Sequence, residues 1–119
     1  MKILVPISVG ELLDKISILQ IKSKHTDNAY VTRELKSLIE IAKQNEVYDV
    51  DYLDQLLNIN QILWNIEDDL RVLEKCQDFS EAFVKLARSV YITNDTRSSL
   101  KKEINEKYNS FYSEVKIHK

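Results

Sequence analysis

Glycine, proline and cysteine are almost missing from this chain of 119 residues, which has one of each. Sandwiches and barrels of β-strands need a turn about every eight to twelve residues. A single Gly and a single Pro therefore argue against both folds. Neither the G-x-G-x-x-G fingerprint nor the P-loop can be written with one Gly. The lone Cys76 excludes a disulfide framework within the chain and a cysteine-based zinc cluster. The composition therefore predicts a compact, soluble, mainly helical protein, with one domain over residues 1–119.

A strong net charge and long apolar runs are also missing. The formal net charge is −2 and the pI is about 5.7, whereas nucleic-acid binders usually have a clustered basic face and a high pI. The apolar start over residues 1–7 is broken by Pro6 and is too short for a membrane span or a signal-peptide core. We therefore expect a cytoplasmic protein that binds neither nucleic acid nor membrane. Its start should form an extended arm on the core or on a neighbouring subunit.

Apolar residues recur at spacings of three and four, which is typical of helices with one buried face. Ser8 and Glu11 match a capping box, in which the Ser8 hydroxyl accepts from the third helical amide and Glu11 reaches back. The expected helices run from Ser8 to about Lys24, from Asp27 or Asn28 to about Gln44, from Asp49 or Asp51 to about Lys75, and from the segment 78–81 to the segment 108–110.

The links between these helices are short, which favours antiparallel neighbours. The sequence therefore predicts an all-α, antiparallel up-down four-helix bundle with two long C-terminal helices. The first helix is apolar on much of its circumference, so it is either central in the bundle or buried by a partner. We expect a homodimer that covers this helix. Residues 110–119 fit either an extended segment or more helix.

Polar residues interrupt the inward faces of the two long helices. The last helix places four of them on its inward arc: Asn94, Arg97, Lys101 and Asn105. The third helix places four more between its apolar rows: Asn60, Glu67, Arg71 and Glu74. We call these eight residues the polar seam. Because burying an unpaired charge costs several kcal/mol, they must pair, reach water or meet a ligand.

One interpretation of the polar seam is an internal network that fixes how the helices pack. In it, Glu67 pairs with Arg97, and the amides of Asn60 and Asn94 set the register. A kink near residues 94–96 would instead rotate the later part of the last helix away from the core. The pattern alone leaves both alternatives open.

Another interpretation of the polar seam is a cleft that holds an anionic small molecule. Arg97 and Lys101 would bind the anion, and Asn94 and Asn105 would orient it. Glu67 is then the candidate acid or base. This alternative describes a small-anion-binding protein or an enzyme that works between the third and fourth helices.

No pattern indicates a metal ion or a cofactor. Glu11 and Asp14 stand one helical turn apart, as in helical carboxylate metal sites. Such pairs are common by chance in a chain of which 30% of residues are charged. Cys76 has no His near it in sequence to activate its thiol. We therefore expect no metal, no cofactor and an unreactive thiol.

Four stretches of the chain are distinctive. They are residues 5–22 (VPISVGELLDKISILQIK), 63–71 (LWNIEDDLR), 79–97 (FSEAFVKLARSVYITNDTR) and 101–105 (KKEIN). In this order, and over nearly the whole chain, they resemble a small bacterial and phage protein family, domain-of-unknown-function family 6165. The resemblance implies a single-domain protein of similar length without an established activity.

The family's distinctive positions map onto ten residues of this chain, several of them in the polar seam. They are Gly10, Glu11, Asp14, Lys15, Glu67, Asn94, Asp95, Arg97, Lys101 and Asn105. Asn109 stands where the family has a Gly. We expect these positions to mark the part of the molecule that matters most, although the resemblance names no ligand.

The sequence offers no activated nucleophile and no cofactor motif. We therefore expect a non-enzymatic structural or protein-interaction module that acts as a homodimer. The anion-binding cleft remains the alternative function.

Overall fold

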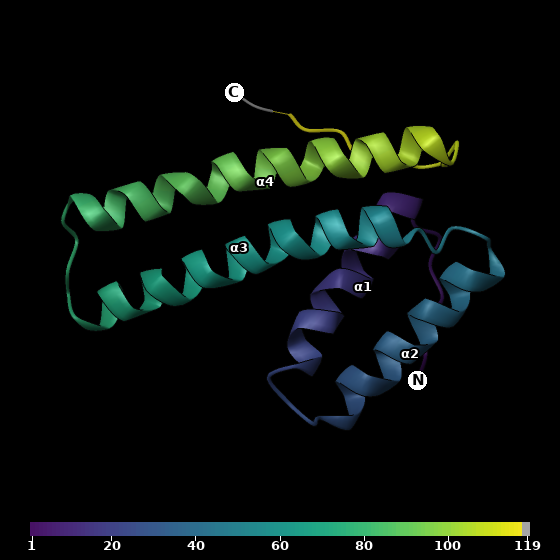
Figure 1. Ribbon diagram of the computed structural model, residues 1–119, viewed down its shortest axis with the longest axis horizontal. Coiled ribbons are helices and arrows are strands. Elements are labelled where there is room, and N and C mark those ends of the chain that lie inside the picture. Colours follow the sequence, from purple (N-terminus) through teal and green to yellow (C-terminus); the bar gives the residue numbers. More distant parts are fainter. Residues whose placement is uncertain (118–119) are drawn as a thin grey trace.

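Four helices and no strands make up the computed structural model, which describes residues 1–117. The helices are α1 (Val9–Ser23), α2 (Ala29–Gln44), α3 (Val50–Lys75) and α4 (Glu81–Lys107). The predicted all-α fold and the two long C-terminal helices are confirmed. Figure 1 shows α3 and α4 side by side as a long antiparallel hairpin, with the shorter α1–α2 hairpin crossing one end of it.

Local side chains fix where the first three helices begin. The Ser8 hydroxyl accepts a hydrogen bond from the Glu11 amide at 3.0 Å, as the capping box requires. Asn28 caps α2 and Asp49 caps α3 in the same way. Glu11 does not reach back to Ser8, because its carboxylate binds Lys101 of α4.

Three helices end with a residue in the left-handed conformation, and none of the three is Gly. The φ angles are 57° at Glu46, 56° at Gln77 and 49° at Asn109. After each of them, the next backbone amide bonds back to the last helical turn, for example from Ser110 to the Asn105 carbonyl at 2.8 Å. These are Schellman caps, which usually carry Gly at this position. The chain forms them although its single Gly lies elsewhere.

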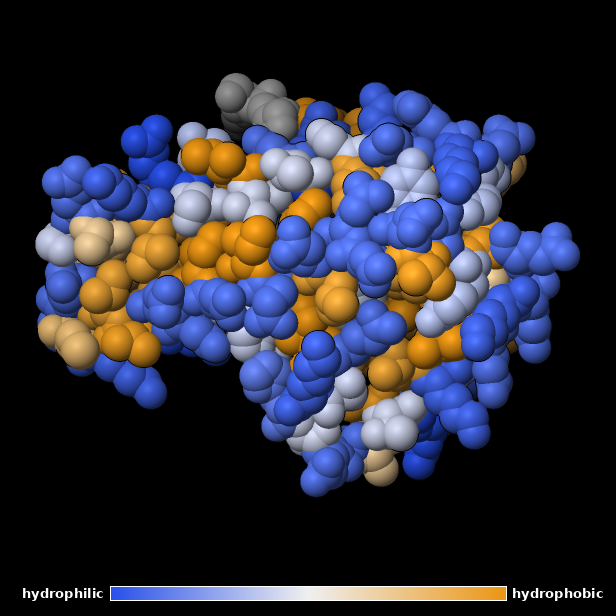
Figure 2. Space-filling view, viewed as in Figure 1, coloured by the Kyte–Doolittle hydropathy of each residue, from blue (hydrophilic) through white to orange (hydrophobic). Residues whose placement is uncertain are grey.

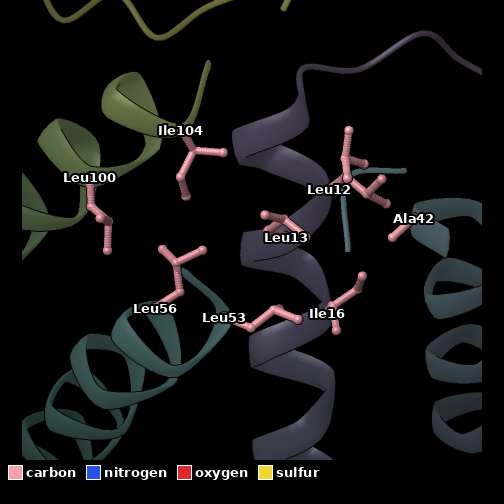
Figure 3. Packing of buried hydrophobic residues seen from close by; sticks show 9 residues of the cluster. Leu12, Leu13, Ile16, Ala42, Leu53, Leu56, Leu100 and Ile104 are labelled. Carbon is pink, nitrogen blue, oxygen red and sulfur yellow. The ribbon is translucent and has the colours of Figure 1, made fainter. Parts of the chain in front are cut away.

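The core lies around α1, which contacts each of the other three helices. Nine buried residues form its main cluster: Leu12, Leu13, Ile16, Ala42, Val47, Leu53, Leu56, Leu100 and Ile104. Figure 3 shows side chains of α2, α3 and α4 from this cluster around those of α1. The wide apolar circumference of α1 is therefore explained by a central position, and it is no reason to expect a partner. Among the helices of the described chain, α2 packs against α1 alone.

The α3–α4 hairpin extends well beyond α1. We call its far part, residues 67–91, the outer half. It contains no buried residue, and apolar side chains such as Val72, Val84 and Tyr91 are 50–57% exposed. Figure 2 shows a hydrophobic band along the junction of α3 and α4 in this region. The radius of gyration, 16.1 Å, accordingly exceeds the value of about 13–14 Å expected for a compact domain of this length.

Asp49 joins the start of α3 to the end of α4. Its Oδ2 accepts hydrogen bonds from Lys107 Nζ at 2.7 Å and from the Tyr108 hydroxyl at 2.5 Å. The hydrogen bond from Lys107, followed by that from Tyr108, lowers the pKa of Asp49 from 3.8 to about 2. The carboxylate thus ties the two helices together at the end opposite Cys76.

Both ends of the described chain lack regular secondary structure. Residues 1–7 have no regular secondary structure, and Ile3, Leu4 and Val5 are largely exposed. Residues 113–117 are also irregular, so the helical alternative is wrong there, and the predictions for residues 118–119 lie outside the described part. No helix in residues 1–117 has the length and apolar character that crossing a membrane requires.

Candidate functional site

A buried carboxylate, Asp14, is the centre of the polar contacts between α1 and α4. Its side chain is 1% exposed. Arg97 donates to it twice, from Nε to Oδ1 at 3.0 Å and from Nη2 to Oδ2 at 2.5 Å. Asn60 of α3 adds a hydrogen bond to Oδ1 at 2.8 Å. A two-pronged Arg–carboxylate pair of this kind fixes both the distance and the orientation of two helices.

Neighbouring polar groups complete the hydrogen bonds of this pair. The Asn60 amide also donates to the Ser17 hydroxyl at 2.8 Å, and that hydroxyl donates to the Asp14 carbonyl at 2.7 Å. Asn94 accepts from Arg97 Nη1 at 3.3 Å. Among the described residues, every fully buried side-chain polar atom has a partner. Such satisfaction is what makes burial of a charged pair tolerable.

Lys101 forms the second cationic position, one turn after Arg97. Its side chain is 9% exposed, and Nζ lies 2.7 Å from Glu11, 3.0 Å from Glu114 and 3.9 Å from Asp14. Burial lowers the pKa of Lys101, but the hydrogen bonds with Glu11 and Glu114 outweigh it, so the pKa rises above its usual value. The hydrogen bonds that Arg97 donates to Asp14 likewise raise the pKa of Arg97. Both groups therefore stay charged.

Gly10 allows α1 to approach α4 closely. Its amide donates to Asn105 Oδ1 at 2.7 Å, and a Cβ at this position would lie 2.6 Å from the Lys101 carbonyl oxygen. No side chain fits at that distance. Gly10 is thus required by the contact between the two helices rather than by an unusual φ angle, since no Gly has a positive φ.

The charges of this cluster largely cancel. Two cations, Arg97 and Lys101, face three carboxylates, Glu11, Asp14 and Glu114. The network formed by these five residues with Gly10, Ser17, Asn60, Asn94 and Asn105 is called the polar network below. A simple anion that bound here would add a negative charge to a cluster in which carboxylates already outnumber cations.

The structure corrects the predicted position of the polar seam. Arg97 pairs with Asp14 and not with Glu67, which is exposed and has Arg71 as its salt-bridge partner at 4.0 Å. The network lies mainly between α1 and α4, and only Asn60 joins it from α3. Helix α4 runs unbroken through residues 94–96.

The remaining predicted residues lie outside the network. Lys15 and Arg71 are exposed, Glu74 is exposed on α3, and Asp95 pairs with Lys116. Sequence reasoning missed Ser17 and Glu114. A signal for α1 was present, because Gly10, Asp14, Ser17 and Ile21 recur at helical spacing and all four are buried.

A small pocket borders the network where α1 leaves the α3–α4 hairpin. Its volume is about 200 Å³. Eight residues line it: Ile18, Ile21, Asn60, Leu63, Trp64, Glu67, Asn94 and Arg97. Trp64 stacks on His25, with 4.8 Å between the ring centroids. In the described part of the chain, no group of three or more His, Cys, Asp or Glu residues is placed to hold a metal ion.

The chain belongs to a family of unknown function, DUF6165, whose model matches residues 1–119. The resemblance found in the sequence motifs is therefore confirmed. No curated protein and no solved structure matches the chain.

Proposed function

We propose that the protein is a non-catalytic interaction module that forms a homodimer through the outer half of the α3–α4 hairpin. The observation that carries the proposal is the lack of any buried residue in this half. Its helices nevertheless keep the apolar spacing of the other part of the hairpin, which packs against α1 and which we call the covered half. Two helices alone cannot bury both faces of such a hairpin. Burial of the exposed apolar side chains of the outer half therefore requires another helical layer.

A groove in the outer half marks the surface that this layer would cover. The groove has a volume of about 400 Å³ and six lining residues: Glu67, Leu70, Arg71, Glu74, Phe83 and Val90. Phe83 and Val90 precede Lys101 by about five and about three helical turns, so they lie on the same face of α4. The groove thus continues the surface on which α1 packs.

A second copy of the chain fits this groove because it offers the same kind of surface in return. One face of α4 carries an apolar band beside the groove: Phe83, Val84, Ala87, Val90 and Tyr91. Two such bands can cover each other in a symmetric, isologous interface. The outer half spans the 25 residues 67–91, and only those on one face can enter the interface. Their number falls below the roughly 20–30 residues per partner of standard stable interfaces, so we expect a reversible dimer.

The position of α1 determines how the two hairpins meet. Because α1 occupies the inner end of the groove face, a second hairpin can enter only with its own α1 at the opposite end. The two Cys76 residues, which lie exposed at the hairpin turns, should then be roughly 20 Å apart along the overlap. Pairing with both turns at the same end would bring them to about 10 Å, the spacing of packed helices.

The polar network supports a structural function rather than catalysis. Its two cations are each held by carboxylates of the same chain, and it contains no activated nucleophile. Its contacts join α1, α3, α4 and the C-terminal segment, so it holds the hairpin in the position that exposes the groove. The anion-binding alternative is correspondingly less well supported.

Light scattering after size exclusion tests the proposal. We expect the mass to approach twice the 14.0 kDa of the chain at high concentration and to fall on dilution. Val84→Glu, which places a charge in the apolar band, should give a monomer at all concentrations. Thr96→Glu adds the same charge on another face of α4 and serves as the matched control. A wild-type protein that stays monomeric, or a dimer that Val84→Glu leaves intact, would contradict the proposal.

A further inference from the structure

The pocket beside the polar network has two kinds of wall. Ile18 and Ile21 of α1, with Leu63 and Trp64 of α3, form an apolar side. The polar side is formed by Asn60, Glu67, Asn94 and Arg97. This combination of an apolar surface and a few converging polar groups is typical of small-molecule sites, although the volume of about 200 Å³ lies below the usual range for drug-sized ligands. An occupant must therefore be small.

Arg97 keeps hydrogen-bonding capacity on the edge that Asp14 does not use. A guanidinium has five N–H donors, and three of them are used, two by Asp14 and one by Asn94 at 3.3 Å. The terminal nitrogens thus retain two N–H groups among the described contacts. A planar acceptor such as a carboxylate matches this edge without disturbing the Asp14 pair.

Glu67 provides a carboxylate on the same pocket. Its side chain is 56% exposed, and its salt-bridge partner Arg71 is 4.0 Å away and 77% exposed. Exposed pairs at that distance contribute little, so Glu67 can accept another donor at small cost. The pocket therefore presents a donor edge at Arg97 and an acceptor at Glu67.

We propose that this pocket binds a small zwitterion, a free α-amino acid with an apolar side chain. The carboxylate would contact Arg97, the ammonium would contact Glu67, and the side chain would lie against Ile18, Trp64 and their apolar neighbours. A zwitterion adds no net charge, so it leaves the existing ion pairs intact. A plain anion would instead add to a cluster in which carboxylates already outnumber cations. The inference rests on the pocket and does not require the dimer, although Glu67 lines both the pocket and the groove.

Trp64 provides a direct readout, because it is the only Trp of the chain and lines the pocket. We would titrate the full chain with L-leucine and follow its fluorescence. Saturable binding in about the millimolar range is expected for a ligand of this size. The matched probes are 4-methylpentanoate, which lacks the ammonium, and 3-methylbutylamine, which lacks the carboxylate. Each should bind at least about tenfold more weakly, since each loses one charged hydrogen bond.

Glu67→Gln removes the proposed ammonium partner from an exposed position, so the fold should persist. We expect it to weaken L-leucine binding about tenfold or more. Glu74→Gln, on the same helix but outside the pocket, should leave binding unchanged. Three outcomes would overturn the proposal: no saturable response to L-leucine, equal binding of 4-methylpentanoate, or equal binding by the Glu67→Gln variant. Tighter binding of inorganic phosphate than of L-leucine would also overturn it, in favour of a simple anion site.

Discussion

The two halves of the α3–α4 hairpin are built from the same kind of helix but have different surroundings. Where α1 crosses the hairpin, α4 buries Leu100, Lys101, Ile104 and Asn105, and these are its only buried residues in the described chain. In the outer half, residues 67–91, neither helix has a buried residue. The covered half also contains the polar network. The comparison shows that the presence of α1, and not the apolar spacing, determines which half becomes a core.

The covered half should be most sensitive at Asp14. Asp14→Ala leaves the half-buried Arg97 without its carboxylate and removes one of the two acceptors of the Asn60 amide. We therefore expect a loss of about 3–5 kcal/mol in the free energy of unfolding. Asp69→Ala, an exposed carboxylate on the outer half, should change it by less than about 0.5 kcal/mol. Urea unfolding measures both. Equal effects of the two variants would remove the energetic distinction between the halves.

Gly10→Ala tests the close contact of α1 and α4. Alanine normally stabilises a helix relative to Gly, but here its Cβ would meet the Lys101 carbonyl. We expect a net loss of about 2 kcal/mol, typical of overpacking. Lys15→Ala, exposed on the same helix, should be nearly neutral in the same unfolding experiment. A stabilised Gly10→Ala variant would show that the helices are further apart than described.

Acid should weaken the tie between α3 and α4 at Asp49. Because its pKa is lowered to about 2 in the folded protein, the ionised carboxylate stabilises the fold above the unfolded pKa near 3.8. That stabilisation, about 1–2 kcal/mol after allowance for solvent screening at Lys107, is lost as the pH falls from about 4 to about 2. Asp49→Asn keeps a helix-capping side chain but cannot ionise. The difference between wild type and variant in urea unfolding should therefore shrink over this pH range, and a constant difference would argue against the ion pair.

The smallest effects are expected at the left-handed caps. Glu46→Gly and Gln77→Gly relieve an unfavourable backbone conformation at opposite ends of the molecule, so each should raise the free energy of unfolding by about 0.5–1 kcal/mol. Lys36→Gly, in the middle of α2, should lower it by about 1 kcal/mol. Thermal unfolding of the three variants would show the reversal of sign. Destabilisation by all three would mean that the caps are not left-handed in solution.

The helices and their boundaries were predictable because their signals are local. Each of the first three helices begins after a capping residue that accepts a backbone hydrogen bond two or three positions later: Ser8, Asn28 and Asp49. The last helix is followed by Asn109, whose residue type tolerates the left-handed conformation that it adopts. The central position of α1 was one of two alternatives that its apolar circumference left open. Packing against three helices decided between them.

The partner of Arg97 was not predictable from a helical wheel. The wheel gives the direction of a side chain but not which helix crosses it, and both Glu67 and Asp14 could have faced Arg97. The selection depends on α1 crossing α4 at Gly10, a contact between residues more than 80 positions apart in the chain. Polar network and pocket alike follow from that crossing.

Hydrogen exchange at different protein concentrations tests the central claim most directly. If the covered half is complete within one chain and the outer half is completed by a second copy, protection in α1 and in residues 97–105 should not depend on concentration. Protection in residues 83–91 of α4 should increase with concentration and be lost in Val84→Glu. An outer half whose exchange is the same at every concentration, in wild type and variant alike, would contradict the account.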